Sequence, residues 1–355
     1  MVFLEILTNY ILPIIYDSFV SLVLVLFFLF IFRIKDSNIR ILFFSLPLIK
    51  PFIVIAEKID VNELTLGYKG FAGGIRFPDP LSFRPILELN KYELVNFSEL
   101  NNLILLTALI SISVILLSRW INIALFYRSL AYEEKVSRKE VPKLYSIIDN
   151  YIKKIKIKAP DISLTHRRYS TPFIVGIRTC TLVLSPTLIE KLNNEETETL
   201  IHHELSHIKR KDNLIGWIAL ILKDLNFFNP FAYISYYLIK DEQEKASDKL
   251  MIIHSDKSTK QVARNILSSI LKINESFKKS FILESSPSHS SSFHFQTILN
   301  NKQIQSRVKN ILKLNPDKIN SQIFPKILMY ILFLIILFIQ IVLVMKFDNM
   351  IIFLR

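Results

Sequence analysis

Four long apolar stretches constrain this chain more than any other feature of its sequence. They are residues 10–32, 41–56, 100–118 and 327–345. A helix of roughly 20 apolar residues is long enough to span the hydrocarbon core of a bilayer. The last two stretches contain no charged residue, while the second is the shortest and carries Lys50 between two prolines. The pattern predicts a multi-pass α-helical membrane protein with four transmembrane helices.

Basic residues beside these stretches indicate how the chain crosses the membrane. Arg33, Lys35 and Arg40 fill the link between the first two stretches, and a dense run of Lys and Arg follows the third. Lys and Arg concentrate on the cytoplasmic side of membrane proteins. We therefore expect the N-terminus outside, an extracytoplasmic loop at 57–99, and a cytosolic segment between the third and fourth helices.

The formal net charge of +13 has the same explanation. Basic residues that flank membrane helices meet the anionic inner leaflet, so a lipid bilayer is the expected partner. The sequence contains no aromatic-interleaved basic motif that would indicate nucleic acid. Cys180 is the single cysteine, which excludes disulfides within the chain and permits a reducing compartment.

Residues 127–324 have the composition of a cytosolic domain between the membrane region 1–126 and the last helix and short tail, 325–355. Three β-favouring runs, DISLTH, TPFIVGI and CTLVLS, precede helix starts at Pro186 and Asn193. They predict an α+β domain with a small sheet and several helices. The apolar pieces within 214–239 are short, so we expect buried helices or a hairpin that dips into the membrane. The Ser-rich stretch 281–295 is predicted to be a mobile loop.

The stretch HHELSH is the strongest chemical signal. His203 and His207 are four residues apart, so on a helix their imidazoles lie on one face and can bind one zinc ion. Glu204 is rotated by about 100 degrees, where its carboxylate can reach a water on the open side of the metal. His202 points away from the pair, and we expect it at the surface or behind the ligands.

Glu244 is the candidate third zinc ligand, in the stretch DEQEKASDKL. Asp248 follows one helical turn later and could accept a hydrogen bond from a ligand imidazole. By itself this stretch is typical of a solvated, charged helix face. Beside HELSH, the metal-binding interpretation becomes the stronger one. The predicted edge strand within TPFIVGI, with Phe173, Ile174, Val175 and Gly176, could bind a substrate backbone as an added strand.

The motifs TPFIVG, LVLSPTLIEKL, HHELSHIKRKDN, NPF and EKASD occur in the order and spacing of a known family. The chain resembles the BlaR/MecR-type membrane zinc metallopeptidases, relatives of the β-lactam sensor transducers. This resemblance implies a gluzincin-like domain in a bacterial cytoplasmic membrane, with His203, His207 and Glu244 as zinc ligands and Glu204 as the base. It also implies that Asp248 supports the site and that Arg307 helps to hold substrate or the loop.

The resemblance has departures. The family motif usually has Arg and Cys where Gln243 and Ser247 stand, and neither change removes a ligand. Sensing members carry a penicillin-binding domain after the fourth helix, for which residues 346–355 leave no room. We therefore expect no direct β-lactam sensing by this chain, and a separate sensor protein or the outer loop would receive any signal.

The expected activity is a membrane-bound, zinc-dependent endopeptidase that cuts a protein substrate, with a cytosolic repressor as one candidate. Self-cleavage within 281–295 is a further expectation. Two alternatives remain at this point. One is a CAAX-type or housekeeping membrane metalloprotease, and the other is a non-catalytic, zinc-containing receptor or scaffold. The sequence does not predict an oligomeric state.

Overall fold

The computed structural model describes residues 11–58, 98–131, 135–165, 172–278, 301–314 and 327–335. The chain forms two compact units. The first contains the described residues up to 116, residues 219–240 and residues 327–335, and the second contains the described residues of 117–218 and 241–321. The expected cytosolic metalloprotease domain at 127–324 stays a prediction. Within that range, residues 219–240 group with the first unit, where Asn226 donates to the carbonyl of Leu48 and Asn229 donates to the Ser18 hydroxyl.

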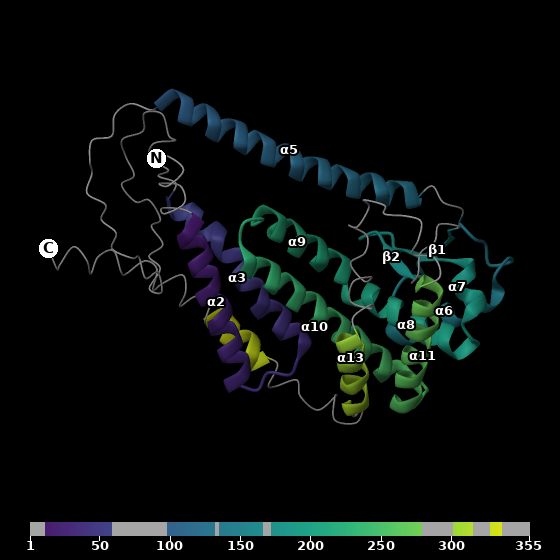
Figure 1. Ribbon diagram of the computed structural model, residues 1–355. Coiled ribbons are helices and arrows are strands. Elements are labelled where there is room, and N and C mark those ends of the chain that lie inside the picture. The colour runs from purple at the N-terminus through teal and green to yellow at the C-terminus, as the bar shows by residue number, and fades with distance from the viewer. Residues whose placement is uncertain are drawn as a thin grey trace. The chain divides into compact units, whose positions relative to one another are not determined.

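In the first unit, helices α2 (Leu12–Ile31) and α3 (Ser37–Lys58) lie side by side (Figure 1). Helix α5 (Ser98–Ala131) begins in this unit and continues well beyond the predicted third stretch. Within the described residues, the segment 14–31 of α2 alone combines the length and apolarity of a membrane span, with a mean hydropathy of 2.6. Residues 327–335 are helical. The rest of the predicted fourth helix and nearly all of the loop 57–99 lie outside the described residues.

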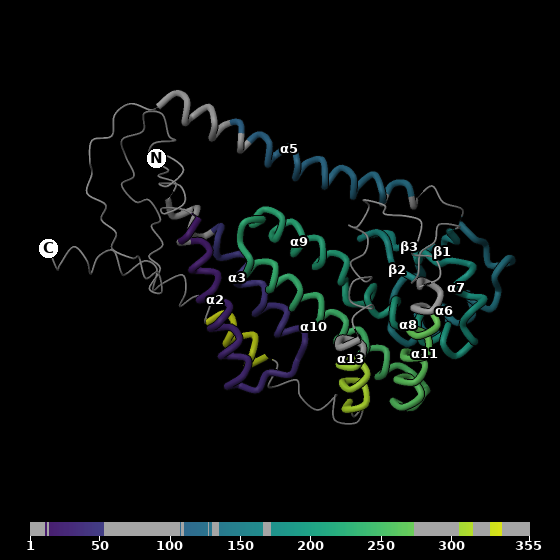
Figure 2. The backbone as a smooth tube through the Cα atoms, viewed as in Figure 1, coloured from purple at the N-terminus to yellow at the C-terminus, as the bar shows by residue number. Residues whose placement is uncertain are grey.

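Helices α9 (Asp212–Leu225) and α10 (Pro230–His254) form a hairpin where we expected buried helices or a membrane-dipping hairpin. Figure 2 shows the chain reversing between them. The backbone N–H of Asn229 donates to the carbonyl of Asn226 at 2.9 Å and closes the turn. Lys223 lies over the ring of Tyr236, 4.8 Å from its centroid, so the two helices also meet through side chains.

The second unit contains the expected three-stranded sheet, with β1 (Asp161–Leu164), β2 (Phe173–Val175) and β3 (Thr181–Leu184) in the order β1-β3-β2. Strand β3 pairs parallel with β1 and antiparallel with β2, with Ile174 opposite Leu182. Successive side chains of a strand point to opposite faces. Leu182 therefore packs into the core beneath α6 and α8, while Val183 packs with Val175 against Phe126 of α5.

Helix α8 (Asn194–Arg210) carries HHELSH and is buried along most of its length. Ile201 and Leu205 pack in the sheet core with residues of α6 (Pro142–Ile155). On another side, Asn265 of α11 (Thr259–Lys278) donates to the Thr199 hydroxyl at 3.1 Å. The helix begins with a capping box, in which Asn193 accepts from the N–H of Glu196 and donates its own N–H to the Glu196 carboxylate.

Two further helices complete the described part of this unit. The short α7 (Pro186–Lys191) begins at the predicted proline, directly after β3. Helix α13 (Asn301–Lys313) packs on α11, with Ile311 and Val308 in a core cluster that includes Met251 and Ile266. Helix α13 is therefore packed against the last turns of α10. The predicted loop 281–295 lies outside the described residues.

The acid at the start of α8 gives a pH-dependent prediction. Burial raises the pKa of Glu196, but Lys272, Ser268 and the N–H of Asn193 outweigh burial and lower it. A carboxyl whose folded pKa lies below its unfolded value of about 4.3 stabilises the fold above that pH. This contribution is lost as the pH falls through the folded pKa.

We expect Glu196→Gln to lower the free energy of unfolding by roughly 1 kcal/mol at pH 7. The difference in free energy of unfolding between this variant and the wild type should shrink as the pH falls from 5 to 3. Thermal unfolding at several pH values would measure it. Glu190→Gln, at an exposed residue of α7, is the matched control and should show no such difference. A difference between Glu196→Gln and wild type that stays constant with pH would contradict this assignment.

Candidate metal centre

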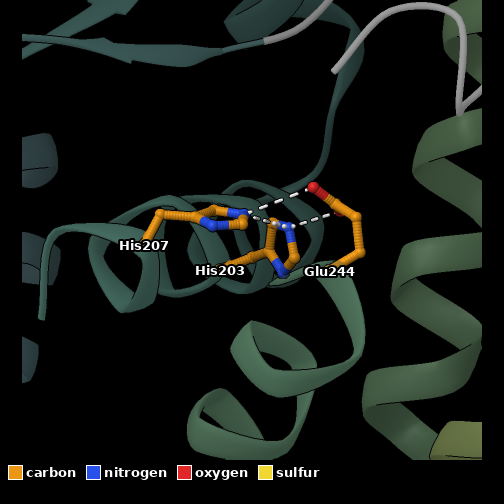
Figure 3. A group of neighbouring side chains, drawn as sticks. All are labelled: His203, His207 and Glu244. Carbon is orange, nitrogen blue, oxygen red and sulfur yellow. Dashed lines mark hydrogen bonds and ion pairs between the residues drawn. The ribbon is translucent and has the colours of Figure 1, made fainter. Parts of the chain in front are cut away.

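Three side chains from two helices converge in the second unit. His203 and His207 project from one face of α8, and Glu244 reaches toward them from α10 (Figure 3). Each offers one ligand atom, and these atoms lie within 4.8 Å of one another. Both imidazoles are buried, and the Glu244 side chain is 13% exposed. The structure thus brings together the three residues that the sequence predicted as ligands.

The separations within this group match the edges of a tetrahedral metal site. The two Nε2 atoms are 3.1 Å apart, Glu244 Oε2 lies 3.3 Å from His203 Nε2, and the other oxygen, Oε1, lies 3.6 Å from His207 Nε2. Two atoms bound to a tetrahedral zinc at its usual bond lengths are about 3.4 Å apart. These residues therefore fit a single ion of that size.

Each histidine has a carboxylate within hydrogen-bond distance of its Nδ1 atom. Asp248 Oδ1 lies 2.9 Å from His203 Nδ1, and Asp212 Oδ2 lies 2.8 Å from His207 Nδ1. A carboxylate accepts a hydrogen bond, so each Nδ1–H donates to the carboxylate beside it, and each Nε2 faces the centre. At 3.1 Å the two Nε2 atoms can share a proton, or both can bind a metal ion when both are deprotonated.

The carboxylates around His203 also favour a positive charge on its ring, as its pKa shows. Burial and Arg307 lower this pKa, but Asp248 and Glu244 outweigh them and raise it to about 9. Burial would raise the pKa of Asp212, yet His207 and Arg210 lower it. Asp248 likewise has a lowered pKa, because Arg307 and His203 outweigh its burial. The centre is a buried group of carboxylates that favours a bound cation.

Asp212 is the main residue that sequence reasoning missed. It is the first residue of α9 and is 4% exposed, and it also accepts from Arg210 Nε at 3.0 Å. Lys211, with φ of 58°, ends α8 in the left-handed region and turns the chain back toward His207. The acid directly after the HELSH helix was the available signal.

Gln243 and Ser247, where the sequence departs from the family motif, both contact this acid. The Ser247 hydroxyl donates to Asp212 Oδ2 at 3.1 Å and lies 2.9 Å from His207 Nδ1. The Gln243 amide donates to the backbone carbonyl of Asp212 at 3.1 Å. These two side chains of α10 therefore hold the carboxylate that faces His207.

Glu204 lies between the two histidines in sequence and is 4% exposed. Its Oε2 is buried and accepts no hydrogen bond from the described residues. An unsatisfied buried carboxylate oxygen is costly, so such an atom indicates a partner that the protein itself does not supply. A metal ion or the water of a metal site would satisfy it.

Arg307 reaches the centre from α13. It makes a bidentate contact with Asp248, Nε to Oδ2 and Nη2 to Oδ1, both at 2.7 Å, and its Nη1 is 3.4 Å from Glu244 Oε2. Its Nη2 is also 3.0 Å from both ring nitrogens of His203. A position equidistant from both nitrogens lies over the ring face, so we interpret this contact as stacking. Arg307 thus contacts the metal-binding group itself.

His202 was expected at the surface or behind the ligands, and the surface position is wrong. It is 7% exposed, and its ring stacks on Tyr151 of α6 at a centroid distance of 4.0 Å. Burial lowers the pKa of His202 to about 4, although Glu198 opposes this, so the ring is neutral at pH 7. Helices on several sides of α8 leave no solvated face for it.

The predicted substrate strand is at an edge of the sheet, but part of that edge is occupied. Asn213 donates to the carbonyls of Ile174, at 3.2 Å, and Gly176, at 2.9 Å. Gly176 has φ of 97°, and a Cβ there would lie 2.0 Å from the carbonyl oxygen of Thr179. Phe173 and Val175 are the neighbouring strand residues. Any added peptide strand would share this edge with Asn213.

Comparisons with known proteins place the sequence in a family. A sequence profile described as BlaR1 peptidase M56 matches residues 88–311. The methicillin resistance mecR1 protein of Staphylococcus aureus is 30% identical over 146 residues, which are 39% of this chain and 22% of that protein.

Two relatives named protease HtpX homolog also match. The Bacteroides fragilis protein is 31% identical over 123 residues, 33% of this chain and 38% of that protein. The Pyrococcus abyssi protein is 33% identical over 89 residues, 24% of this chain and 31% of that protein. The chain therefore spans well under half the length of these relatives. Because the family profile covers most of the chain, this protein belongs to the BlaR1 peptidase M56 family.

Proposed function

We propose that this protein is a membrane-bound, zinc-dependent endopeptidase that hydrolyses internal peptide bonds of a protein substrate. His203, His207 and Glu244 would hold the zinc ion in a gluzincin-like site. The observation that carries the proposal is that one ligand atom from each of these residues lies within 4.8 Å of the other two, with the two Nε2 atoms 3.1 Å apart. Membership of a peptidase family supports the same reaction class.

When bound, zinc supplies a Lewis acid that polarises a carbonyl and lowers the pKa of water. Glu204 then acts as the general base. Its free Oε2 takes a proton from the attacking water and passes it to the leaving amine nitrogen. A purely structural metal site has no use for a buried carboxylate oxygen that lacks a hydrogen-bond donor among the described residues. This atom therefore favours an enzyme over a scaffold.

The residues behind the ligands would keep the imidazoles in the reactive tautomer. Asp248 and Asp212 each hold one Nδ1–H, which fixes the ring orientation and increases the basicity of Nε2. Arg307 neutralises part of the charge on Asp248 and Glu244. From the same position its guanidinium could bind a substrate carbonyl, the role that we expected for it.

The apolar stretches support a location in the bacterial cytoplasmic membrane, with four transmembrane helices, the N-terminus outside and the peptidase domain in the cytosol. The substrate would then be a cytosolic or membrane-associated protein. The mecR1 relative is named for methicillin resistance, which favours a regulatory role over housekeeping. A cytosolic repressor is our candidate substrate, with a separate sensor protein as partner and self-cleavage at 281–295 as a further possibility to test.

Glu204→Gln tests the proposed base. The substitution keeps the size of the side chain but removes its ability to accept a proton. We expect zinc content to stay at one per chain, while cleavage of a peptide or protein substrate falls by at least 100-fold. Elemental analysis and a comparison of new protein termini in cells with either variant would provide the two measurements.

Glu198→Gln is the matched control for this test, because Glu198 lies on the same helix and is partly exposed. It should leave both zinc content and cleavage unchanged. Undiminished proteolysis by Glu204→Gln would show that another group is the base. A metal-free wild-type protein whose activity is indifferent to chelators would refute the peptidase mechanism altogether.

Asp212→Asn tests the carboxylate that the sequence did not predict. Loss of its charge should weaken zinc binding by roughly 10- to 100-fold, because the His207 ring loses its orientation and part of its basicity. Competition with a coloured chelator would measure the affinity. Asp241→Asn, at a partly exposed residue of α10, is the control. Equal zinc affinity of the two variants would show that Asp212 does not support the ligand.

A further inference from the structure

The hairpin of α9 and α10 buries its polar side chains and exposes apolar ones. We use the name hairpin segment for residues 219–240, the part of this hairpin that belongs to the first unit. Its buried polar residues, each between 0% and 7% exposed, are Lys223, Asp224, Asn226, Asn229 and Ser235. Its exposed apolar and aromatic residues, at 38% to 57%, are Ile221, Leu225, Phe227, Ile234 and Tyr237. A helical hairpin with its outer face in water has the opposite arrangement.

The two buried asparagines find their partners inside the first unit. The Asn226 amide donates to the carbonyl of Leu48 in α3 at 3.3 Å, and the Asn229 amide donates to the hydroxyl of Ser18 in α2 at 2.7 Å. A buried polar group is stable only when it is hydrogen-bonded. These two side chains therefore do not depend on water outside the hairpin for their partners.

The charged residues of the hairpin segment before Lys240 form a buried pair. They are Lys223 and Asp224, whose Nζ and Oδ1 atoms are 3.1 Å apart. The Lys223 ammonium also lies over the rings of Tyr233 and Tyr236, 5.2 and 4.8 Å from their centroids. Ionisable residues in a membrane are costly and almost always pair with one another or face the interior of a bundle. The pairing of these two charges is therefore the arrangement that a lipid environment requires.

The turn between the two helices pairs backbone donors within the chain. The N–H of Asn226 donates to the carbonyl of Leu222 at 3.1 Å, and the N–H of Asn229 donates to the carbonyl of Asn226 at 2.9 Å. The N–H of Phe231 donates to Asn229 Oδ1 at 3.1 Å, and Pro230 has no N–H. Non-helical backbone is tolerated at membrane depth only where it is buried in protein or lines a cavity. This turn, LNFFNP, has no charged residue, and both of its asparagines are buried.

The contact with α2 places the turn beside an apolar helix. Residues 14–31 of α2 have the length and apolarity of a membrane span. Ser18, which accepts from Asn229, is about 6 Å along the helix from Ile14 and about 20 Å from Ile31. The turn therefore lies within the length of this segment and not beyond either end.

The exposed apolar surface of α2 continues onto the hairpin segment. Phe19 of α2 is 43% exposed and packs on Phe231 of α10 at a ring centroid distance of 5.0 Å. Val23 follows Phe19 one helical turn later and is 46% exposed. Because the two surfaces adjoin, the lipid chains that surround a membrane-spanning α2 would also meet the apolar face of the hairpin segment.

We propose that the exposed apolar residues of the hairpin segment contact lipid acyl chains and that its turn lies inside the hydrocarbon core. The α9 part, residues 219–225, is about 10 Å long and too short to cross a core of about 30 Å. Because the chain reverses at the turn, the segment enters and leaves the bilayer on one side. This inference rests on the proposed membrane location of α2 and not on the zinc site.

The test uses the purified full-length chain in nanodiscs of phosphatidylcholine and phosphatidylglycerol. Cys180 is the single cysteine, so a Cys180→Ser background allows one fluorophore to be attached at one chosen residue. Phe227→Cys and Ile234→Cys test the hairpin segment. Val23→Cys on α2 is the membrane control, and Asn150→Cys, at an exposed residue of α6, is the aqueous control. Quenching is measured with lipids that are brominated on their acyl chains and, separately, with a water-soluble nickel chelate.

We expect the brominated lipids to quench the labels at positions 227 and 234 about as strongly as the label at position 23, and the nickel chelate to quench the label at position 150 alone. Quenching of either hairpin label by the nickel chelate would place the segment in water and overturn the proposal. Protection of both hairpin labels from both quenchers would also overturn it, because a protein surface would then cover this face. A label at position 23 that the lipids do not quench would refute the membrane location of α2, on which the proposal rests.

Discussion

The hydrogen bonds from two buried imidazoles to two carboxylates are the contacts on which the second unit depends, because they turn both Nε2 atoms, 3.1 Å apart, toward one centre. The fold must hold these side chains in place. Asp248 and Asp212 do so by accepting the Nδ1 protons, and they come from two different helices. Helix α8 is in turn fixed by the sheet core and by the capping box at Asn193. Together with Glu244, these carboxylates favour a small cation at the centre.

Burial on several sides distinguishes α8 from an ordinary amphipathic helix. Ile201 faces the sheet, His202 faces α6, and Thr199 faces α11. Each of these neighbours restricts the rotation of α8 about its axis, and the direction of His203 and His207 follows from that rotation. Polar residues on this helix are therefore packing residues as much as chemical ones, and His202 is the clearest case, since its stacked ring is neutral at pH 7.

The parts of the site that depend on local periodicity could be predicted from the sequence. A spacing of four residues places His203 and His207 on one face in any α-helix, and the short β-favouring runs formed the expected sheet. Contacts that depend on chain direction could not be predicted. Asp212 reaches His207 only because Lys211 adopts a left-handed conformation, for which a glycine would be the usual signal. The grouping of 219–240 with the first unit likewise depends on distant acceptors, the Leu48 carbonyl for Asn226 and the Ser18 hydroxyl for Asn229.

The left-handed residue at Lys211 has a consequence for chain length. Helices α8 and α9 adjoin at this single residue, so no spare linker separates them. The next two side chains contact different partners. Asp212 accepts a hydrogen bond from His207, and Asn213 donates to the carbonyls of Ile174 and Gly176, at the end of β2. Inserting or deleting one residue here would exchange or remove both partners at once. The number of residues between His207 and Asn213 is therefore constrained, because this segment joins the metal-binding helix to the edge of the sheet.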